Sequence, residues 1–379
     1  MDLFPFHPFQ KHSSSRSHLP PGTLIPDEIG ITPTIEAISY GKDTFEKTTI
    51  TSEEVGKWRG QNPVLWLSII GLGDTEVYHR LQTEFDLHPL ALEDTLDANQ
   101  SAKVEDYDDY LFIVLRIPKT LHRYVSEQVS LFLFHDMVIS VQQGPKDHLL
   151  PVLRRIEGNR GRIRQLGADY LCYALIDVLV DLYFPYLDSF ANDLDNLEEK
   201  ILDSRDHLTP DLIHSAKRDM LALRRVLRPL RDALKTLSHE EVEFISPEVI
   251  LFLRDCYDHA VQALDLTETY REFVSGLMDL HLAFVSTKMN EVMKVLTLIA
   301  TLFIPLTFIV GIYGMNFNTS VSAWSMPELN WKWGYPAIML LMVLIITFQL
   351  LYFRYKRWLG GGTKPSHLAI SRIRKKKVE

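Results

Sequence analysis

The chain has 379 residues, which is enough for two or three domains, and a formal net charge of −9 at pH 7. Residues 1–290 are acidic and residues 354–377 are basic, so the composition speaks against a nucleic-acid partner and favours cations. The two cysteines, Cys172 and Cys256, lack the spacing of a disulfide framework or a thiolate metal site, and we expect a reducing compartment.

Residues 26–160 mix strand-like and helical patterns, which predicts a cytoplasmic α/β domain after a disordered tail over residues 1–25. The tail lacks the basic and apolar regions of a secretory signal. Helical patterns occur at Asp74–Phe85 and at His88–Leu96, where Pro89 suits a first turn. Several strand orders fit the connections, so the topology stays open. Six β-branched or aromatic runs have strand length: Thr34–Tyr40, Lys47–Thr51, Val64–Ile70, Tyr110–Ile117, Val129–Phe134 and Met137–Gln142.

Residues 161–245 predict a helical hairpin. Its first helix carries an acidic surface and should bend at Pro185, and its second helix starts at Thr209-Pro210 and carries a basic surface. The opposite charges either form ion pairs worth under about 1 kcal/mol each or remain solvated. Apolar residues three and four apart give the first helix a coiled-coil seam: Tyr183, Leu187, Phe190, Leu194, Leu197 and Ile201.

Residues 246–313 predict one stalk helix that starts at Ser246-Pro247-Glu248 and contains no further proline before Pro305. At 1.5 Å per residue it would be about 100 Å long and would lead from the cytoplasm into a bilayer. Its last part, Val295–Tyr313, carries no charge, and neither does Pro336–Phe353. Each is long enough to cross a hydrocarbon core of about 30 Å, so we expect a membrane hairpin.

The flanks of this hairpin predict its orientation. The connecting loop, residues 314–334, is aromatic-rich and nearly uncharged, which suits a periplasmic position. Residues 335–358 form the second span, and the tail over residues 359–379 is basic. Positive charge stays cytoplasmic, so both termini should be cytoplasmic. The cluster nearest the membrane comprises Arg354, Lys356 and Arg357.

One face of the first span has a neutral, partly polar composition. It suits either close helix packing or a pore, and a pore would need several copies in a closed ring. Neutral hydroxyl and amide groups could hold the waters of hydrated Mg²⁺, and no intramembrane carboxylate is present for a proton relay. Met293 and Ile304 could form an apolar constriction. The face comprises Asn290, Met293, Thr297, Ala300, Ile304, Thr307 and Gly311.

Several motifs together resemble the CorA family of divalent cation channels over roughly residues 30–358. The Gly-Met-Asn motif alone would be weak, but it stands between two apolar spans and is followed by a Met-Pro-Glu-Leu loop. The resemblance implies a funnel-shaped homopentamer in the inner membrane with a cytoplasmic α/β domain, a long stalk helix and two C-terminal transmembrane helices. The motifs are Tyr313–Asn316, Met326–Leu329, Asn290–Thr297, Arg254–His259 and His88–Asp94.

The resemblance also implies roles for individual residues. Transport of Mg²⁺, with Co²⁺ or Ni²⁺ as further ions, would run down the electrochemical gradient and be closed by intracellular Mg²⁺ between subunits. Gly314, Met315 and Asn316 would form the outer selectivity ring. Matching pore-lining positions are Asn290, Met293, Leu296, Ile304 and Thr307. The implied regulatory ligands are Asp94 with Asp255 of the neighbouring subunit, and Glu93, Asp177 and His259 as a second set. Arg354, Lys356 and Arg357 match a basic ring at the inner mouth.

Other functions remain open at this point. The loop Phe317–Ser325 is longer than in the compact form of the family, which bears on the outer mouth. A Zn²⁺ or Ni²⁺/Co²⁺ transporter of the same superfamily is one alternative, and a membrane-anchored scaffold or sensor is another. An enzyme with an organic substrate is not expected, because residues 239–243 (HEEVE) lack the second histidine of a zinc-protease motif.

Overall fold

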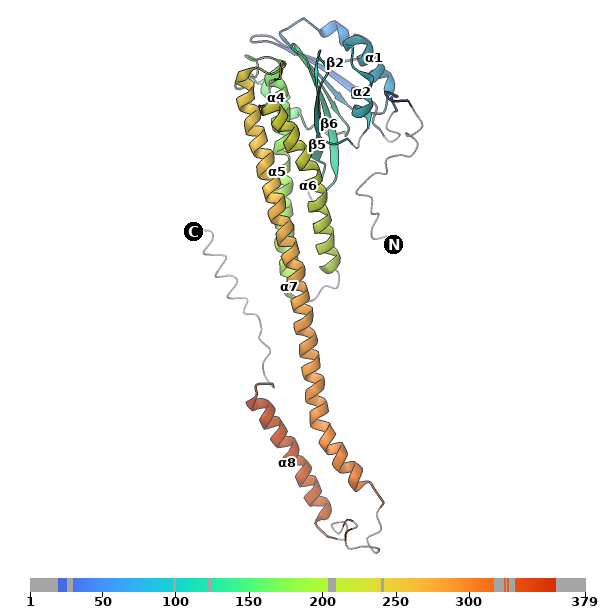
Figure 1. Cartoon of the computed structure of the whole chain (residues 1–379), viewed down its shortest axis with the longest axis vertical. Coiled ribbons are helices and arrows are strands. Elements are labelled where there is room, and N and C mark those ends of the chain that lie inside the picture. The colour runs from blue at the N-terminus through green and yellow to red at the C-terminus, as the bar shows by residue number, and fades with distance from the viewer. Residues whose placement is uncertain are drawn as a thin grey trace. The chain divides into compact units, whose positions relative to one another are not determined.

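The computed structural model describes residues 20–25, 30–97, 100–120, 124–203, 209–239, 242–316, 324, 326 and 331–358 (Figure 1). The chain divides into two compact units, Met1–His281 and Leu282–Glu379. The first unit is an α/β body and the second is a pair of apolar helices.

The first unit is organised around a seven-stranded sheet with the strand order β2-β1-β3-β7-β6-β5-β4. β3 and β7 pair in parallel, and the other neighbouring strands pair antiparallel. This topology answers the question that the sequence left open. The strands are β1 (Thr34–Tyr40), β2 (Phe45–Ile50), β3 (Val64–Ile70), β4 (Lys103–Asp106), β5 (Leu111–Pro118), β6 (Ser126–Leu133) and β7 (Met137–Gln142).

The strand predictions are confirmed in six cases, with ends displaced by a few residues at β2, β5 and β6. β4 was not predicted. Its sequence is Lys-Val-Glu-Asp, so three of its four residues are charged and the usual strand composition is lacking. Charged residues are common on edge strands because they discourage pairing with another sheet. β4 is such an edge strand, and it pairs with β5 alone among the described strands.

Helices cover both faces of this sheet. The 3-10 helix η2 (Ser52–Trp58), α1 (Thr75–Phe85) and α2 (Pro89–Leu96) share a hydrophobic core with one face. α4 (Ala168–Asp181), α5 (Tyr183–Asp203) and α6 (Thr209–His239) lie on the other, as Figure 1 shows. The short α3 (Leu150–Glu157) precedes them. α2 starts as expected, with Pro89 in its first turn, and the imidazole of His88 accepts a hydrogen bond from the Leu90 N–H.

The region 161–245 contains α4, α5 and α6. The first expected helix is interrupted only at Leu182, a residue that keeps helical backbone angles, close to the bend expected at Pro185. Pro185 has no N–H to bond the Asp181 carbonyl four residues earlier, so the helix breaks one turn before the proline. The apolar seam of α5 is confirmed and buried. The basic residues Arg224 and Arg228 of α6 both pair with Glu268, which lies on the next helix.

That helix, α7 (Pro247–Tyr313), is a continuous helix of 67 residues, as predicted. Its first part packs in the α/β body through buried residues such as Leu253, Ala260 and Thr267. Its last part belongs to the second unit together with α8 (Gly334–Tyr355).

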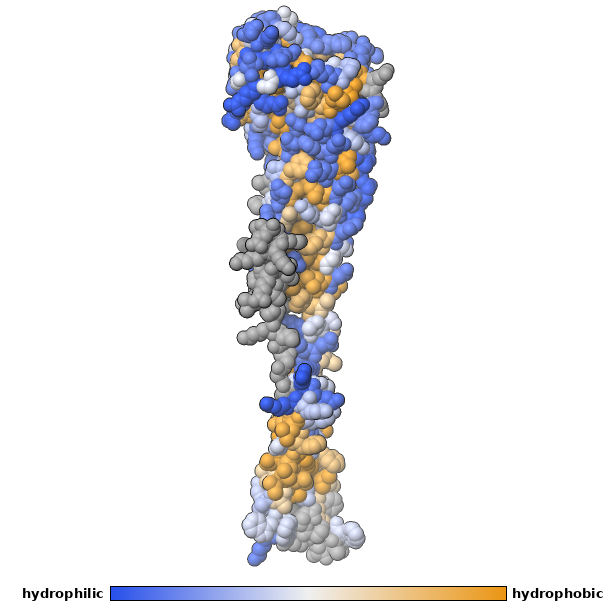
Figure 2. Space-filling view, turned by 90° about the vertical axis from the view of Figure 1, so that its left-hand side faces the viewer, coloured by the Kyte–Doolittle hydropathy of each residue, from blue (hydrophilic) through white to orange (hydrophobic). Residues whose placement is uncertain are grey.

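Among the described residues, three helical stretches are long and apolar enough to cross a membrane. The first, Ala168–Leu202, is 67% buried in its apolar window and forms core of the α/β body. The apolar windows of α7 and α8 are 0% and 6% buried. Figure 2 shows the hydrophobic side chains that this leaves on the surface. An apolar surface of this extent is incompatible with exposure to water, so both helices need lipid or further copies of the chain around them.

A buried ionic cluster connects β6 with the segment that follows the sheet. The carboxylate of Glu127, 5% exposed, lies 2.6 Å from Lys119 Nζ and 3.4 Å from His148 Nε2. The hydrogen bond with His148 lowers the pKa of Glu127, and Lys119 adds to this effect against the opposing influence of burial.

Because the pKa of Glu127 is lower in the folded state, its ionised form contributes stability above the unfolded-state pKa of about 4.3, and this contribution disappears as the pH falls through the folded-state pKa. We expect Glu127→Gln to lower the free energy of unfolding by about 2 kcal/mol at pH 7. Thermal unfolding should therefore separate the variant from the wild type at pH 7, and the two should converge only as the pH falls through the lowered folded-state pKa of Glu127. Equal midpoints at pH 7 would contradict the assignment.

Candidate ion pathway and metal sites

The neutral stripe predicted on α7 is solvent-accessible in the isolated chain. Met293, Leu296 and Ile304 are 60%, 64% and 64% exposed. Ala300 alone among the predicted positions is half-buried. The other exposed members are Asn290, Thr297, Thr307 and Gly311.

α8 packs against a different stripe of α7. The half-buried positions of α7 include Leu298, Leu302, Pro305 and Ile309. Gln349 of α8 donates a hydrogen bond from Nε2 to the carbonyl of Thr301 over 3.1 Å. This carbonyl lies four residues before Pro305, whose missing N–H would otherwise have bonded it. α8 therefore satisfies the carbonyl that the proline leaves without its helical partner.

The two threonines of the stripe present oxygen rather than hydrogen to their surroundings. Thr297 Oγ1 donates to the Met293 carbonyl over 2.8 Å, and Thr307 Oγ1 donates to the Phe303 carbonyl over 3.0 Å. With their protons used inside the helix, these hydroxyls keep lone pairs that accept hydrogen bonds. Water in the first shell of a metal cation donates its hydrogens outward, so the stripe suits a hydrated cation.

The Gly-Met-Asn motif follows directly on the C-terminal end of α7. The Gly314 N–H bonds the Val310 carbonyl over 2.8 Å, and Met315 and Asn316 are exposed. A Cβ at Gly314 would lie 3.1 Å from that same carbonyl, which leaves little room for a side chain. The C-terminal end of a helix carries partial negative charge and attracts cations.

The Met-Pro-Glu-Leu motif and most of the loop between the helices, including the predicted long segment Phe317–Ser325, lie outside the described residues, which contain only Trp324 and Met326 of this region. Beyond the loop, Trp331, Trp333 and Tyr335 are exposed near the start of α8.

The predicted basic residues at the other end of α8 are also exposed. Arg354 lies in the last turn of the helix, and Lys356 and Arg357 follow directly. Cations at a helix C-terminus are favourable because they complement the helix dipole. The aromatic residues and the basic residues therefore lie at opposite ends of one apolar helix.

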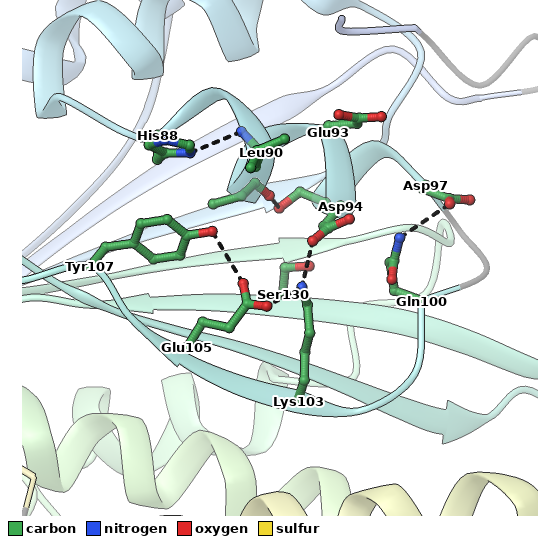
Figure 3. A network of polar contacts seen from close by, with 12 residues as sticks. His88, Leu90, Glu93, Asp94, Asp97, Gln100, Lys103, Glu105, Tyr107 and Ser130 are labelled. Carbon is green, nitrogen blue, oxygen red and sulfur yellow. Dashed lines mark hydrogen bonds and ion pairs between the residues drawn. The ribbon is translucent and has the colours of Figure 1, made fainter. Parts of the chain in front are cut away.

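In the α/β body, the predicted regulatory residue Asp94 already has a cationic neighbour (Figure 3). Lys103 Nζ lies 2.5 Å from Asp94 Oδ2 and 2.6 Å from Glu105 Oε1. The other oxygen of Glu105 accepts a hydrogen bond from the Tyr107 hydroxyl over 3.1 Å. Sequence reasoning missed Lys103 and Glu105 because it missed β4. Their spacing of two residues, which places them on one face of a strand, was the available signal.

The protonation of these groups follows from their contacts. Partial burial raises the pKa of Asp94, and the hydrogen bond and charge of Lys103 act in the opposite direction. Burial alone would lower the pKa of Lys103, but its bonds to Asp94 and Glu105 raise it. The ammonium group therefore stays charged at neutral pH.

Glu93 faces elsewhere, although it is adjacent to Asp94. Its Oε2 accepts a hydrogen bond from the Gly22 N–H over 2.6 Å, and Figure 3 shows the two carboxylates directed to different sides of α2. Within one chain, Glu93 does not join the other predicted ligands of the second set.

Asp177 and His259 of that set do meet, and Asp181 joins them. One ligand atom from each lies within 4.8 Å of the others. His259 Nδ1 is 3.4 Å from Asp181 Oδ1, and its Nε2 is 3.9 Å from Asp255 Oδ2. Burial and the charge of Asp181 raise the pKa of Asp177. Asp181 was missed, although it lies one helical turn after Asp177 on α4.

The donor set of Asp177, Asp181 and His259 fits a divalent metal. Carboxylate oxygens are the ligands that Mg²⁺ prefers, and it commonly uses one or two of them and keeps several waters. The added imidazole of His259 also suits Co²⁺ or Ni²⁺. The side chain of Asp255 is 65% exposed.

Comparison with known proteins decides the family. Residues 63–357 match the sequence profile described as "CorA-like Mg2+ transporter protein". The chain belongs to this CorA-like family. The cobalt/magnesium transport protein CorA of Thermotoga maritima is 43% identical over 355 residues, which cover 92% of this chain and 99% of that protein. The putative metal ion transporter YfjQ of Bacillus subtilis is 34% identical and covers 77% of this chain and 89% of its own.

Solved structures agree with the CorA-like fold. The complete CorA magnesium transporter of Methanocaldococcus jannaschii superimposes with a TM-score of 0.74 at 23% identity, over 87% of this chain and 100% of that one. The cytoplasmic domain of ZntB from Vibrio parahaemolyticus has a TM-score of 0.52 and covers 66% of this chain and 96% of its own. The predicted resemblance is confirmed, and transport rather than catalysis is the activity for which the named CorA relatives are known.

Proposed function

We propose that this chain is one subunit of a homopentameric channel that carries hydrated Mg²⁺, and also Co²⁺ or Ni²⁺, into the cytoplasm down the electrochemical gradient. The observation that carries the proposal is the exposed neutral stripe on α7, which leads to Gly314, Met315 and Asn316 and is not used by α8. Two helices cannot enclose a pore, so a closed ring of copies would bring several such stripes around one axis.

The ion would pass with much of its hydration shell. Asn316 would accept hydrogen bonds from the bound waters through its amide oxygen, beside the negative end of the α7 dipole. Farther along, the lone pairs of Thr297 and Thr307 would accept further bonds, and the apolar side chains of Met293 and Ile304 would narrow the pore. No step requires removal of all waters, which Mg²⁺ resists.

The membrane arrangement follows from the flanks of α7 and α8. Both helices would cross the plasma (inner) membrane, with residues 314–334 on the periplasmic side and both termini in the cytoplasm. The aromatic residues before α8 suit the outer interface. Arg354, Lys356 and Arg357 suit the inner one and would form the basic ring.

Closure would depend on metal bound between subunits, where Asp94 faces Asp255 of a neighbour. A bound Mg²⁺ supplies positive charge that offsets the repulsion of the two carboxylates and favours the closed arrangement by differential binding. Asp177, Asp181 and His259 would hold a second ion near Asp255, with Glu93 contributed from across the interface.

Replacement of the selectivity amide tests the pathway. We expect Asn316→Ala to reduce Mg²⁺ flux into liposomes more than about tenfold, because a hydrogen bond to a charged or strongly polarised group contributes about 1.5–3 kcal/mol. Asn192→Ala, on the exposed surface of α5, is the control and should transport normally. Normal flux through Asn316→Ala would rule out the assigned role. Separate assays with Mg²⁺, Co²⁺, Ni²⁺ and Zn²⁺ would define the ion preference.

Removal of both proposed ligand charges tests regulation. We expect Asp94→Asn combined with Asp255→Asn to raise the Mg²⁺ concentration needed to protect the purified protein from proteolysis. Asp232→Asn is the control, because the Asp232 carboxylate on α6 is about as exposed as that of Asp255. This variant should need the same Mg²⁺ concentration for protection as the wild type. If the double variant is protected at the wild-type concentration, the regulatory metal is bound elsewhere.

The assembly can be measured directly. Native mass spectrometry of the protein in detergent should show the five copies of the proposed homopentamer. A shared pore lined by the neutral stripes requires a closed ring of chains. A spectrum containing monomers alone would contradict the shared pore.

A further inference from the structure

Lys103 supplies a positive charge directly beside Asp94. Its ammonium group lies within hydrogen-bond distance of two carboxylates from different elements, Asp94 on α2 and Glu105 on β4. It also lies 5.7 Å from the centre of the Phe112 ring. This side chain is 26% exposed, so it is held in place rather than free in solvent.

Both sides of this contact are anchored. The Asp94 carbonyl accepts a hydrogen bond from Gln128 Nε2 over 2.7 Å, and Gln128 is 2% exposed. Lys103 is fixed by strand pairing opposite Val114 of β5. The backbones of β4 and α2 therefore hold Lys103 and Asp94 next to each other. The contact is a fixed part of the fold.

A positive charge at this place opposes any cation that binds Asp94. By Coulomb's law in water, a unit charge about 4 Å from a divalent ion weakens its binding by at least about tenfold. Lys103 also uses Asp94 Oδ2, one of the two oxygens that Asp94 can offer. An ion that binds Asp94 through this oxygen displaces Lys103 from it.

Glu105 gives Lys103 somewhere to remain when that happens. Its bond to Lys103 does not involve Asp94, and the Tyr107 hydroxyl holds its second oxygen. If Lys103 left Asp94, its ammonium group would still be paired with Glu105. Binding of a metal ion to Asp94 would therefore not leave a partly buried charge without a partner.

We propose that Lys103 is a competitor of the regulatory metal: it pairs with Asp94 when metal is scarce, keeps Glu105 as its only carboxylate partner when metal binds, and so sets the Mg²⁺ concentration at which the channel closes. This inference rests on the proposed function, in which Asp94 is a metal ligand. It adds a residue that tunes affinity without contacting the ion.

The ion pair of Lys47 and Glu36 supplies a matched control. Its N–O distance is 3.1 Å and both side chains are 30% exposed, much like Lys103 and its partners. It lies on β2 and β1, at the opposite edge of the same sheet from β4. Replacing Lys47 removes the same charge and a comparable ion pair, but at the edge of the sheet opposite to β4.

The test measures protection from proteolysis against Mg²⁺ concentration in the purified full-length protein. Lys103→Met should reach half protection at about tenfold lower Mg²⁺ than the wild type, whereas Lys47→Met should not shift. Glu105→Gln should shift in the opposite direction, to higher Mg²⁺, because Lys103 then has only Asp94 as a charged partner. Loss of folding would not move two variants in opposite directions, and thermal unfolding in EDTA confirms that each is folded.

An Asp94→Asn background separates this inference from the proposed function. If Asp94→Asn weakens protection and Lys103→Met has no further effect in it, competition at Asp94 is supported. If Asp94→Asn weakens protection but Lys103→Met alone behaves as the wild type, or needs more Mg²⁺, the competitor role is overturned and the metal site stands. If Asp94→Asn leaves protection unchanged, both are overturned.

Discussion

The backbone hydrogen bonding of α7, complete within the helix except at Pro305, is the constraint on which the rest of the structure depends. An α-helix satisfies its own peptide groups, so the same element can be packed in a folded body at one end and covered only by apolar side chains at the other. α7 does this over 67 residues. Asp255 and His259 near its start and Asn290 near its end therefore belong to one helix, and Gly314 follows directly on that helix.

Periodicity in the sequence was sufficient for most of this architecture. The six predicted strands and the long helix are local patterns, and the Gly-Met-Asn motif with its two apolar flanks pointed to the family. β4 could not be found this way, because its charged residues become a strand only through pairing with β5. The network of Asp94, Lys103 and Glu105 depends on that pairing. Similarly, Asp181 was within reach by helical spacing from Asp177, but the proximity of His259 is a product of tertiary packing.

The sequence left open whether the neutral stripe of α7 serves helix packing or lines a pore. The contact that α8 makes with α7 bears on this question. Since α8 uses the stripe that includes Pro305, the neutral stripe is left to interactions beyond a single chain. The orientation of the threonine hydroxyls then matters chemically, because donors committed to the helix leave acceptors outside. A surface of acceptors with no formal charge distinguishes hydrated cations from anions without holding either tightly.

The bond from Gln349 to the Thr301 carbonyl has a mechanical meaning. In hydrocarbon, a backbone carbonyl without a hydrogen-bond partner costs several kcal/mol. The bond from Gln349 therefore favours one position of α8 along α7. Rotation of α7 about its axis, or sliding along it, would break this hydrogen bond and leave the Thr301 carbonyl without a partner. A twist of α7 at the level of Thr301 would therefore carry α8 with it, and the bond from Gln349 would limit how far these two helices can turn against each other.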